Sequence, residues 1–92
     1  MIIRWLHLAE KDLDDLFVFV AQDSLAMAEK EVDRVIGEVA RLQSHPAMGR
    51  PGRVPETREL VIVPYIVAYR VKGSTIQILR VLHSAREWPE EF

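Results

Sequence analysis

The amino-acid sequence predicts an α+β fold in which a helical hairpin packs on a small, mostly antiparallel sheet, in the order β-α-α-β-β-β. Apolar residues recur every three or four positions between residues 9 and 45, which is the period of a helix. Apolar and β-branched runs separated by short turns fill residues 58–83, which is typical of strands. Helices gathered before a run of antiparallel strands indicate an α+β domain. Its 92 residues are expected to form one domain, 1–92.

The first half begins with a short strand and a helix. The run "IIRWL" at 2–6 is rich in β-branched and aromatic residues. From Ala9 the period changes, and one helical stripe follows: Leu13, Leu16, Phe17 and Val20. The sequence therefore predicts a strand followed directly by an amphipathic helix.

A second helix follows the break "QDS" at 22–24, where Asp23 or Ser24 can cap its N-terminus. We expect it to stop near His45, because Pro46 disfavours helical geometry in the residue before it. Two helices joined by so short a link form an antiparallel hairpin.

The second half begins with a loop, 46–57, which contains three prolines and two glycines. Strand patterns then span 58–63, 65–71 and 75–83. Gly73 in the tight turn between the last two runs is free to take a positive φ. The last two strands are therefore expected to form a hairpin.

Composition excludes several classes of protein. The chain has no cysteine, so a disulfide framework and a thiolate metal site are excluded. No segment approaches the roughly 20 apolar residues of a membrane span, and the N-terminus turns acidic too early for a secretion signal. We expect a cytoplasmic protein with no cofactor and no membrane contact.

Charge is distributed unevenly along the chain, although the net charge is only −2. Residues 1–45 hold five basic and nine acidic side chains, whereas residues 46–86 hold seven basic and two acidic ones. Such asymmetry can create a basic face on an acidic protein. Ordinary surface charge is the alternative interpretation.

The chemistry-bearing residues gather near the C-terminus. The three histidines are too scattered for a metal site, but His83 lies where the last strand emerges, with Arg80 and Arg86 close in sequence. A histidine there can move a proton, or it can be a hydrogen-bonded residue at the strand end. Trp88 and Phe92 either fold back on the sheet or anchor a partner.

The remaining arginines also have two interpretations. Strict alternation places Arg58 on one face with Leu60, and Arg80 on one face with Ile76 and Ile78. An arginine in such a row either pairs with an acid such as Glu59 at the rim of the core or lines a groove. The chain has no nucleophile elbow, P-loop or dinucleotide fingerprint.

Residues 49–89, "GRPGRVPETRELVIVPYIVAYRVKGSTIQILRVLHSAREWP", resemble the RelE/ParE superfamily of toxins from bacterial type II toxin–antitoxin operons. The G-R-x-G loop, R-E-L, Y-I-V-x-Y-R-V and I-L-R-V-L-H-x-x-R-x-W-P carry the resemblance, and "AEKDLDDLFVFVAQDS" is similar to the first helix of this family. The resemblance implies the fold predicted above.

The resemblance also implies growth arrest through one of two targets. ParE-like members inhibit DNA gyrase, and the contact candidates are Arg50, Arg53, Arg58, Trp88 and Phe92. RelE-like members cleave mRNA on the ribosome, with His83 as acid/base and Arg58, Arg80 and Arg86 on the scissile phosphate. The ParE-like function is favoured, because Ile66 and Ser84 stand where RelE-type nucleases carry arginines.

Under either function the resemblance implies a cognate antitoxin as partner, and contact with operator DNA only through that antitoxin. A segment of the antitoxin is expected to fold on binding and to cover an apolar groove of the toxin.

Overall fold

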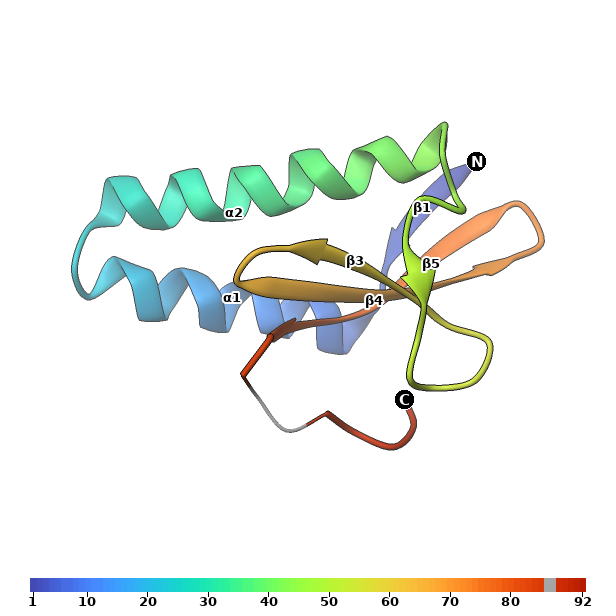
Figure 1. Ribbon diagram of the computed structural model, residues 1–92. Helices are drawn as coiled ribbons and strands as arrows, with labels where there is room; N and C mark the ends of the chain where they lie inside the picture. The colour runs from blue at the N-terminus through green and yellow to red at the C-terminus, as the bar shows by residue number, and fades with distance from the viewer. Residues whose placement is uncertain (86–87) are drawn as a thin grey trace.

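The fold is a helical hairpin on one side of a small, mostly antiparallel sheet, as the sequence predicts (Figure 1). The sheet has five strands, one more than expected. The computed structural model describes residues 1–85 and 88–92. The elements follow in the order β1 (Ile2–Trp5), α1 (His7–Ala21), α2 (Leu25–Ala40), a 3₁₀ turn η1 (Arg41–Gln43), β2 (Arg50–Pro51), β3 (Arg58–Ile62), β4 (Tyr65–Lys72) and β5 (Thr75–His83).

The helix boundaries differ slightly from those expected. α1 begins at His7, because Leu6 already accepts the first helical hydrogen bond from Glu10. α2 is capped by Ser24, whose hydroxyl accepts a hydrogen bond from the Met27 amide at 3.2 Å. It ends at Ala40 rather than near His45, since the chain tightens into η1 before Pro46.

The sheet has the strand order β1-β5-β4-β3-β2. The pairs β2–β3, β3–β4 and β4–β5 are antiparallel. β1 pairs in parallel with the first part of β5, from Ile2 opposite Thr75 to Trp5 opposite Ile78. Gly73 takes φ +62° in the turn between β4 and β5, as expected for this hairpin. The two-residue strand β2 was not predicted, because the expected loop 46–57 contains no strand pattern.

The core lies between the hairpin and the sheet. Side chains that are almost fully buried meet there from both layers: Ala9, Leu16, Val35 and Val39 from the helices, and Leu60, Val67, Tyr69, Ile76 and Ile78 from the sheet. The opposite face of the sheet is also covered. Residues 88–92 at the C-terminus lie on that side of the sheet, away from the helices (Figure 1). Buried Ile66 and Ala68 belong to that face.

One prediction about side-chain direction is wrong. A bulge between β4 and β5 shifts the register, so that Ile78 lies opposite Tyr69 but Arg80 lies opposite Ala68. Tyr69 and Ala68 point to opposite faces of β4, and Arg80 therefore does not share a face with Ile78. The bulge turns Arg80 toward α1 at the sheet edge, where it meets Asp12.

Candidate functional site

A buried carboxylate organises the arginines that follow the second helix. Glu59 is 2% exposed and lies opposite Arg50 in the β2–β3 pair. The Nε and Nη2 atoms of Arg50 donate to its Oε1 at 3.1 and 3.0 Å, and the Arg53 amide donates to its Oε2 at 2.8 Å. The Arg53 guanidinium also lies 3.5 Å from Oε2. Glu59 therefore positions two arginines whose side chains remain about half exposed, and its single negative charge balances only one of their two positive charges.

The C-terminal aromatic residues join this cluster. The Arg53 guanidinium carbon lies 4.3 Å from the centre of the Trp88 ring, which is a cation–π arrangement. Phe92 meets Trp88 edge-on, with ring centroids 6.3 Å apart. We call Arg50, Arg53, Trp88 and Phe92 the arginine–tryptophan cluster; Glu59 binds its two arginines. The structure thus brings together four of the five residues that the sequence suggests for target contact.

Arg58, the fifth of these residues, has a different environment. It precedes Glu59 in β3, so its side chain leaves the sheet on the other face. Its Nη1 atom donates to the carbonyl oxygens of Gly49 at 2.8 Å and Ala47 at 3.4 Å. The Tyr69 hydroxyl ties down the same loop, because it donates to Pro46 and accepts from the Gly49 amide. Arg58 therefore fastens the loop before β2 and stands outside the arginine–tryptophan cluster.

Arg80 is occupied by an acid that the sequence reasoning missed. Its Nε and Nη2 atoms donate to Asp12 Oδ2 and Oδ1 at 2.8 and 3.0 Å, and the Val81 amide donates to Oδ2 at 2.8 Å. The hydrogen bonds to Asp12 raise the pKa of Arg80. Asp12 could have been found from its position, since it lies four residues before Leu16 and three after Ala9, in the buried stripe of α1.

His83 lies at the far end of the sheet from Arg58. It is exposed, its Nδ1 accepts a hydrogen bond from the Ala85 amide at 3.1 Å, and its ring meets Tyr65 edge-on. Arg58 is opposite Tyr69 and His83 is opposite Tyr65, so four residues of β4, about 13 Å, separate them. The structure does not bring the described nuclease candidates Arg58, Arg80 and His83 to one point, and Arg86 lies outside the described residues.

Two grooves flank α1. The larger, of about 590 Å³, lies at its C-terminal half beside the end of the sheet. Asp12, Leu16, Tyr65 and His83 contribute to its wall, and Phe19 there is 73% exposed.

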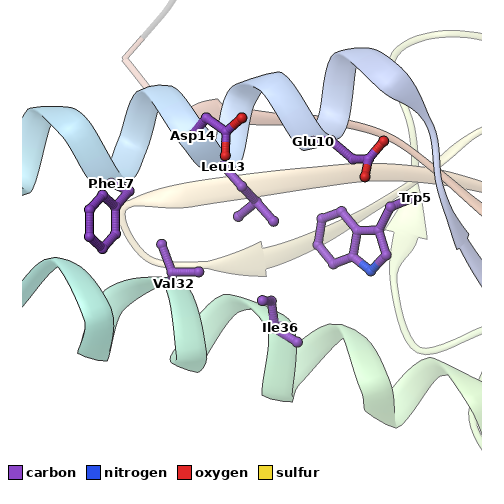
Figure 2. A pocket seen from close by; sticks show the side chains of 7 residues that line it. All are labelled: Trp5, Glu10, Leu13, Asp14, Phe17, Val32 and Ile36. Carbon is purple, nitrogen blue, oxygen red and sulfur yellow. The ribbon is translucent and has the colours of Figure 1, made fainter.

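The smaller groove, of about 380 Å³, lies between α1 and α2. Figure 2 shows Trp5 at one end of it, with side chains from the two helices facing each other across it. We call it the interhelical groove; its apolar residues are Trp5, Leu13, Phe17, Val32 and Ile36, and its acidic residues are Glu10 and Asp14.

Within residues 1–85 and 88–92, no group of three or more histidine, aspartate or glutamate side chains is arranged to hold a metal ion. In the same ranges, no helix has the length and apolar character needed to cross a membrane.

The model of the family described as the ParE toxin of the type II toxin–antitoxin system parDE matches residues 3–88. Protein Y4kP of Sinorhizobium fredii is 39% identical over 90 residues, which cover 96% of this chain and 93% of that protein. Toxin RelE2 of Caulobacter vibrioides is 31% identical over 85 residues, which cover 91% of this chain and 96% of that toxin.

Solved structures show the same architecture. The chromosomal ParDE toxin–antitoxin system from P. aeruginosa superposes with a TM-score of 0.82 and 34% identity, over 90% of this chain and 95% of that chain. The toxin–antitoxin complex RelBE2 from Mycobacterium tuberculosis gives a TM-score of 0.60 and 25% identity, over 89% of this chain and 95% of that chain. The comparisons confirm the predicted fold and the predicted superfamily.

Proposed function

Because this chain belongs to the ParE family of toxins from type II toxin–antitoxin systems, we propose that it arrests bacterial growth by binding DNA gyrase. A cognate antitoxin binds the chain and prevents this contact. The site of action is the cytoplasm, where gyrase works, and operator DNA is reached only through the antitoxin. The inhibition is a protein–protein contact and needs no cofactor.

The arginine–tryptophan cluster is the observation that carries this proposal. Arginine and tryptophan are the residues that most often dominate binding energy at protein interfaces. Here Glu59 and the ring of Trp88 hold the Arg53 side chain in one orientation, while about half of it remains exposed. A side chain ordered before binding loses less entropy when a partner docks. Arg50, Arg53, Trp88 and Phe92 would contact gyrase, and Arg58 would support them through the loop before β2.

A second function is supported by the similarity to Toxin RelE2 and by the exposure of His83. A ribosome-dependent mRNA endonuclease would use His83 as acid/base, with Arg58, Arg80 and Arg86 on the phosphate. Arg80 is bound by Asp12 on two nitrogens and Arg58 lies about 13 Å along β4 from the level of His83. Such a nuclease would therefore have to rearrange these side chains on the ribosome, and we favour the gyrase contact.

The deciding experiment measures supercoiling by purified gyrase and cleavage of mRNA on programmed ribosomes, with the same preparation of toxin. We expect inhibition of supercoiling and intact mRNA. Cleaved mRNA with normal supercoiling would select the endonuclease instead. Inactivity in both assays, from folded protein, would overturn both functions.

Variants assign the contact. We expect Arg53→Gln together with Trp88→Ala to weaken gyrase inhibition at least 10-fold, since both remove partly exposed interface groups. Lys11→Gln changes an exposed cation on α1, away from the arginine–tryptophan cluster, and is the matched control. We expect His83→Ala to leave growth arrest intact, and a loss of arrest in the folded variant would favour the endonuclease.

A further inference from the structure

We propose that the sheet carries a second contact surface, which binds the phosphates of duplex DNA. The surface lies on the face of the sheet opposite the helices, at the end next to the β4–β5 turn. We call it the basic face; its cations are Arg4, Arg70 and Lys72. Such a contact would add DNA to the protein partner of the proposed function. It is independent of base sequence, so operator DNA is still recognised through the antitoxin.

Charge is separated between the two layers of the molecule. Residues 7–43, which form the helices, their link and η1, hold nine acidic and four basic side chains. The five strands hold six basic side chains and one acidic one, Glu59. The helices lie on one side of the sheet (Figure 1). A polyanion that approaches the other side therefore meets a basic surface, although the net charge of the chain is −2.

The strand register places the three cations together. Gln77 of β5 lies opposite Arg4 of β1 on one side and opposite Arg70 of β4 on the other. The Nε atom of Arg70 donates to Gln77 Oε1 at 2.6 Å, so these two side chains share a face. Lys72 and Thr75 are opposite each other in the next row of the same face. Arg4 and Arg70 are thus two strand spacings apart, about 10 Å, with Lys72 two positions along β4.

The basic face points away from the helices. Tyr69 and Ile76, the chain neighbours of Arg70 and Gln77, are fully buried in the core beneath the helical hairpin. Because side chains alternate along a strand, Arg70 and Gln77 point to the other side. Arg4 and Lys72 are exposed and Arg70 is half-buried. Within residues 1–85 and 88–92, none of the three cations forms an ion pair.

The side chains of the basic face favour phosphate over a protein surface. Arginine, lysine, glutamine and threonine all donate hydrogen bonds to the phosphates of DNA. A protein interface is instead centred on large, well-packed apolar or aromatic anchors. Here the central row, Arg4–Gln77–Arg70, is polar, and the exposed Ile2 lies on the edge strand. Two arginines about 10 Å apart can reach phosphates on both sides of a DNA groove, since the grooves are about 6 and 12 Å wide.

The test measures the fluorescence anisotropy of a short labelled DNA duplex as the chain is added at several salt concentrations. We expect binding at low salt, weakening as salt rises. Each phosphate contact contributes about −0.9 to the slope of log affinity against log salt, so three cations predict a slope of about −2.7. Arg4→Gln combined with Lys72→Gln should make that slope about 1.8 shallower. Both side chains are exposed, so the variant should stay folded, and circular dichroism checks this.

The matched control is Lys11→Gln combined with Lys30→Gln. It removes the same amount of charge from two exposed positions on the helices, on the far side of the sheet. We expect the slope of the unmodified chain from this control. Equal slopes in the two double variants would overturn the inference, because binding would then follow net charge and not the basic face. A folded chain that does not bind the duplex at low salt would also overturn it.

Affinity for purified gyrase without DNA tests the other class of partner. We expect the Arg4→Gln/Lys72→Gln variant to bind DNA-free gyrase as the unmodified chain does. A loss of that affinity with unchanged DNA binding would mean that the basic face meets an acidic protein surface, and the inference would be wrong.

The anisotropy assay contains no gyrase, so its result is independent of the proposed function. A chain that inhibits supercoiling but does not bind the duplex would overturn the DNA contact alone. A chain that binds the duplex through the basic face but leaves supercoiling intact would support the DNA contact and overturn the gyrase function alone.

Discussion

Two buried carboxylates hold three arginines of this protein in place. Asp12 is 8% exposed and binds Arg80, and Glu59 is 2% exposed and binds Arg50 and Arg53. Each also accepts a hydrogen bond from a backbone amide. Buried charges persist in proteins only when they are paired and hydrogen-bonded, and both acids meet that condition. Removing either acid would leave arginines and amide groups without acceptors.

The Asp12 pair can be tested by Asp12→Ala. We expect the free energy of unfolding to fall by about 3 kcal/mol, since the change leaves a largely buried guanidinium and the Val81 amide unpaired. Urea denaturation followed by circular dichroism measures the loss. Asp15→Ala is the control. The Asp15 side chain is 64% exposed, so its ion pair with Lys11 should contribute less than about 0.5 kcal/mol to the free energy of unfolding. Equal losses in the two variants would contradict the prediction.

Tyr69 gives the stability a dependence on alkaline pH. Burial raises the pKa of Tyr69 above its ordinary value of 10.0. A raised pKa means that the stability from the neutral phenol is fully present below pH 10 and is lost as the pH rises through the folded-state pKa. Tyr69→Phe should lose about 1 kcal/mol at neutral pH with the two hydrogen bonds. Above pH 10 the Tyr69→Phe variant should lose less stability than the unmodified chain. Urea denaturation midpoints measured at a series of pH values check this. A parallel decline in both proteins would contradict this.

The bulge between β4 and β5 decides where Arg80 points. Alternation along a strand predicts faces correctly only while the register is regular. Leu60 and Ile62 follow that rule, and Arg58 shares their face as predicted. Arg80 does not, because the register slips by one residue between Ile78 and Arg80. No local pattern in the sequence marks this slip.

Substituting two glycines by alanine should change the stability in opposite directions. Gly37 lies in the interior of α2 with open space around it, so Gly37→Ala should stabilise the protein by about 0.5–1 kcal/mol. Gly73 has φ +62° in the β4–β5 turn, where an L-residue with a Cβ is strained. Gly73→Ala should therefore destabilise it by about 1–2 kcal/mol. Thermal denaturation of both variants checks the signs, and the same sign for both would contradict the structural argument.

Besides the basic face, three surfaces with candidate roles in binding surround the small core of the protein. The arginine–tryptophan cluster lies where β2 and β3 meet the C-terminal segment, and the two grooves lie on either side of α1. Large apolar side chains remain exposed near the larger groove, with Phe19 at 73% and Val63 at 75%. Exposed apolar surface of this kind marks interaction sites or a tendency to aggregate.

The free toxin should therefore be less stable and less soluble than its complex. A ligand that binds only the folded state at 1,000 times its dissociation constant adds about 4 kcal/mol to the free energy of unfolding. We expect the melting temperature of this chain to rise with antitoxin concentration. We also expect light scattering by a concentrated solution of the chain to fall when antitoxin is added. A melting temperature independent of antitoxin concentration, above stoichiometric amounts, would contradict the proposed partnership.

Helical and strand periodicities and turn residues act over a few neighbouring positions, so the amino-acid sequence was enough to predict both helices, every strand except β2, and their order. Its motifs were enough to show the resemblance to the superfamily. The comparisons confirm the predicted fold and family. The roles of Arg50, Arg53, Trp88 and Phe92, which the sequence suggested as contact residues, stay predictions.

Which of these residues meet depends on how the helices pack on the sheet. The partners Asp12 and Arg80 are 68 residues apart, and a bulge and a two-residue strand direct the arginines. Contacts of that separation depend on how a helix packs on a sheet edge, and no local pattern encodes it.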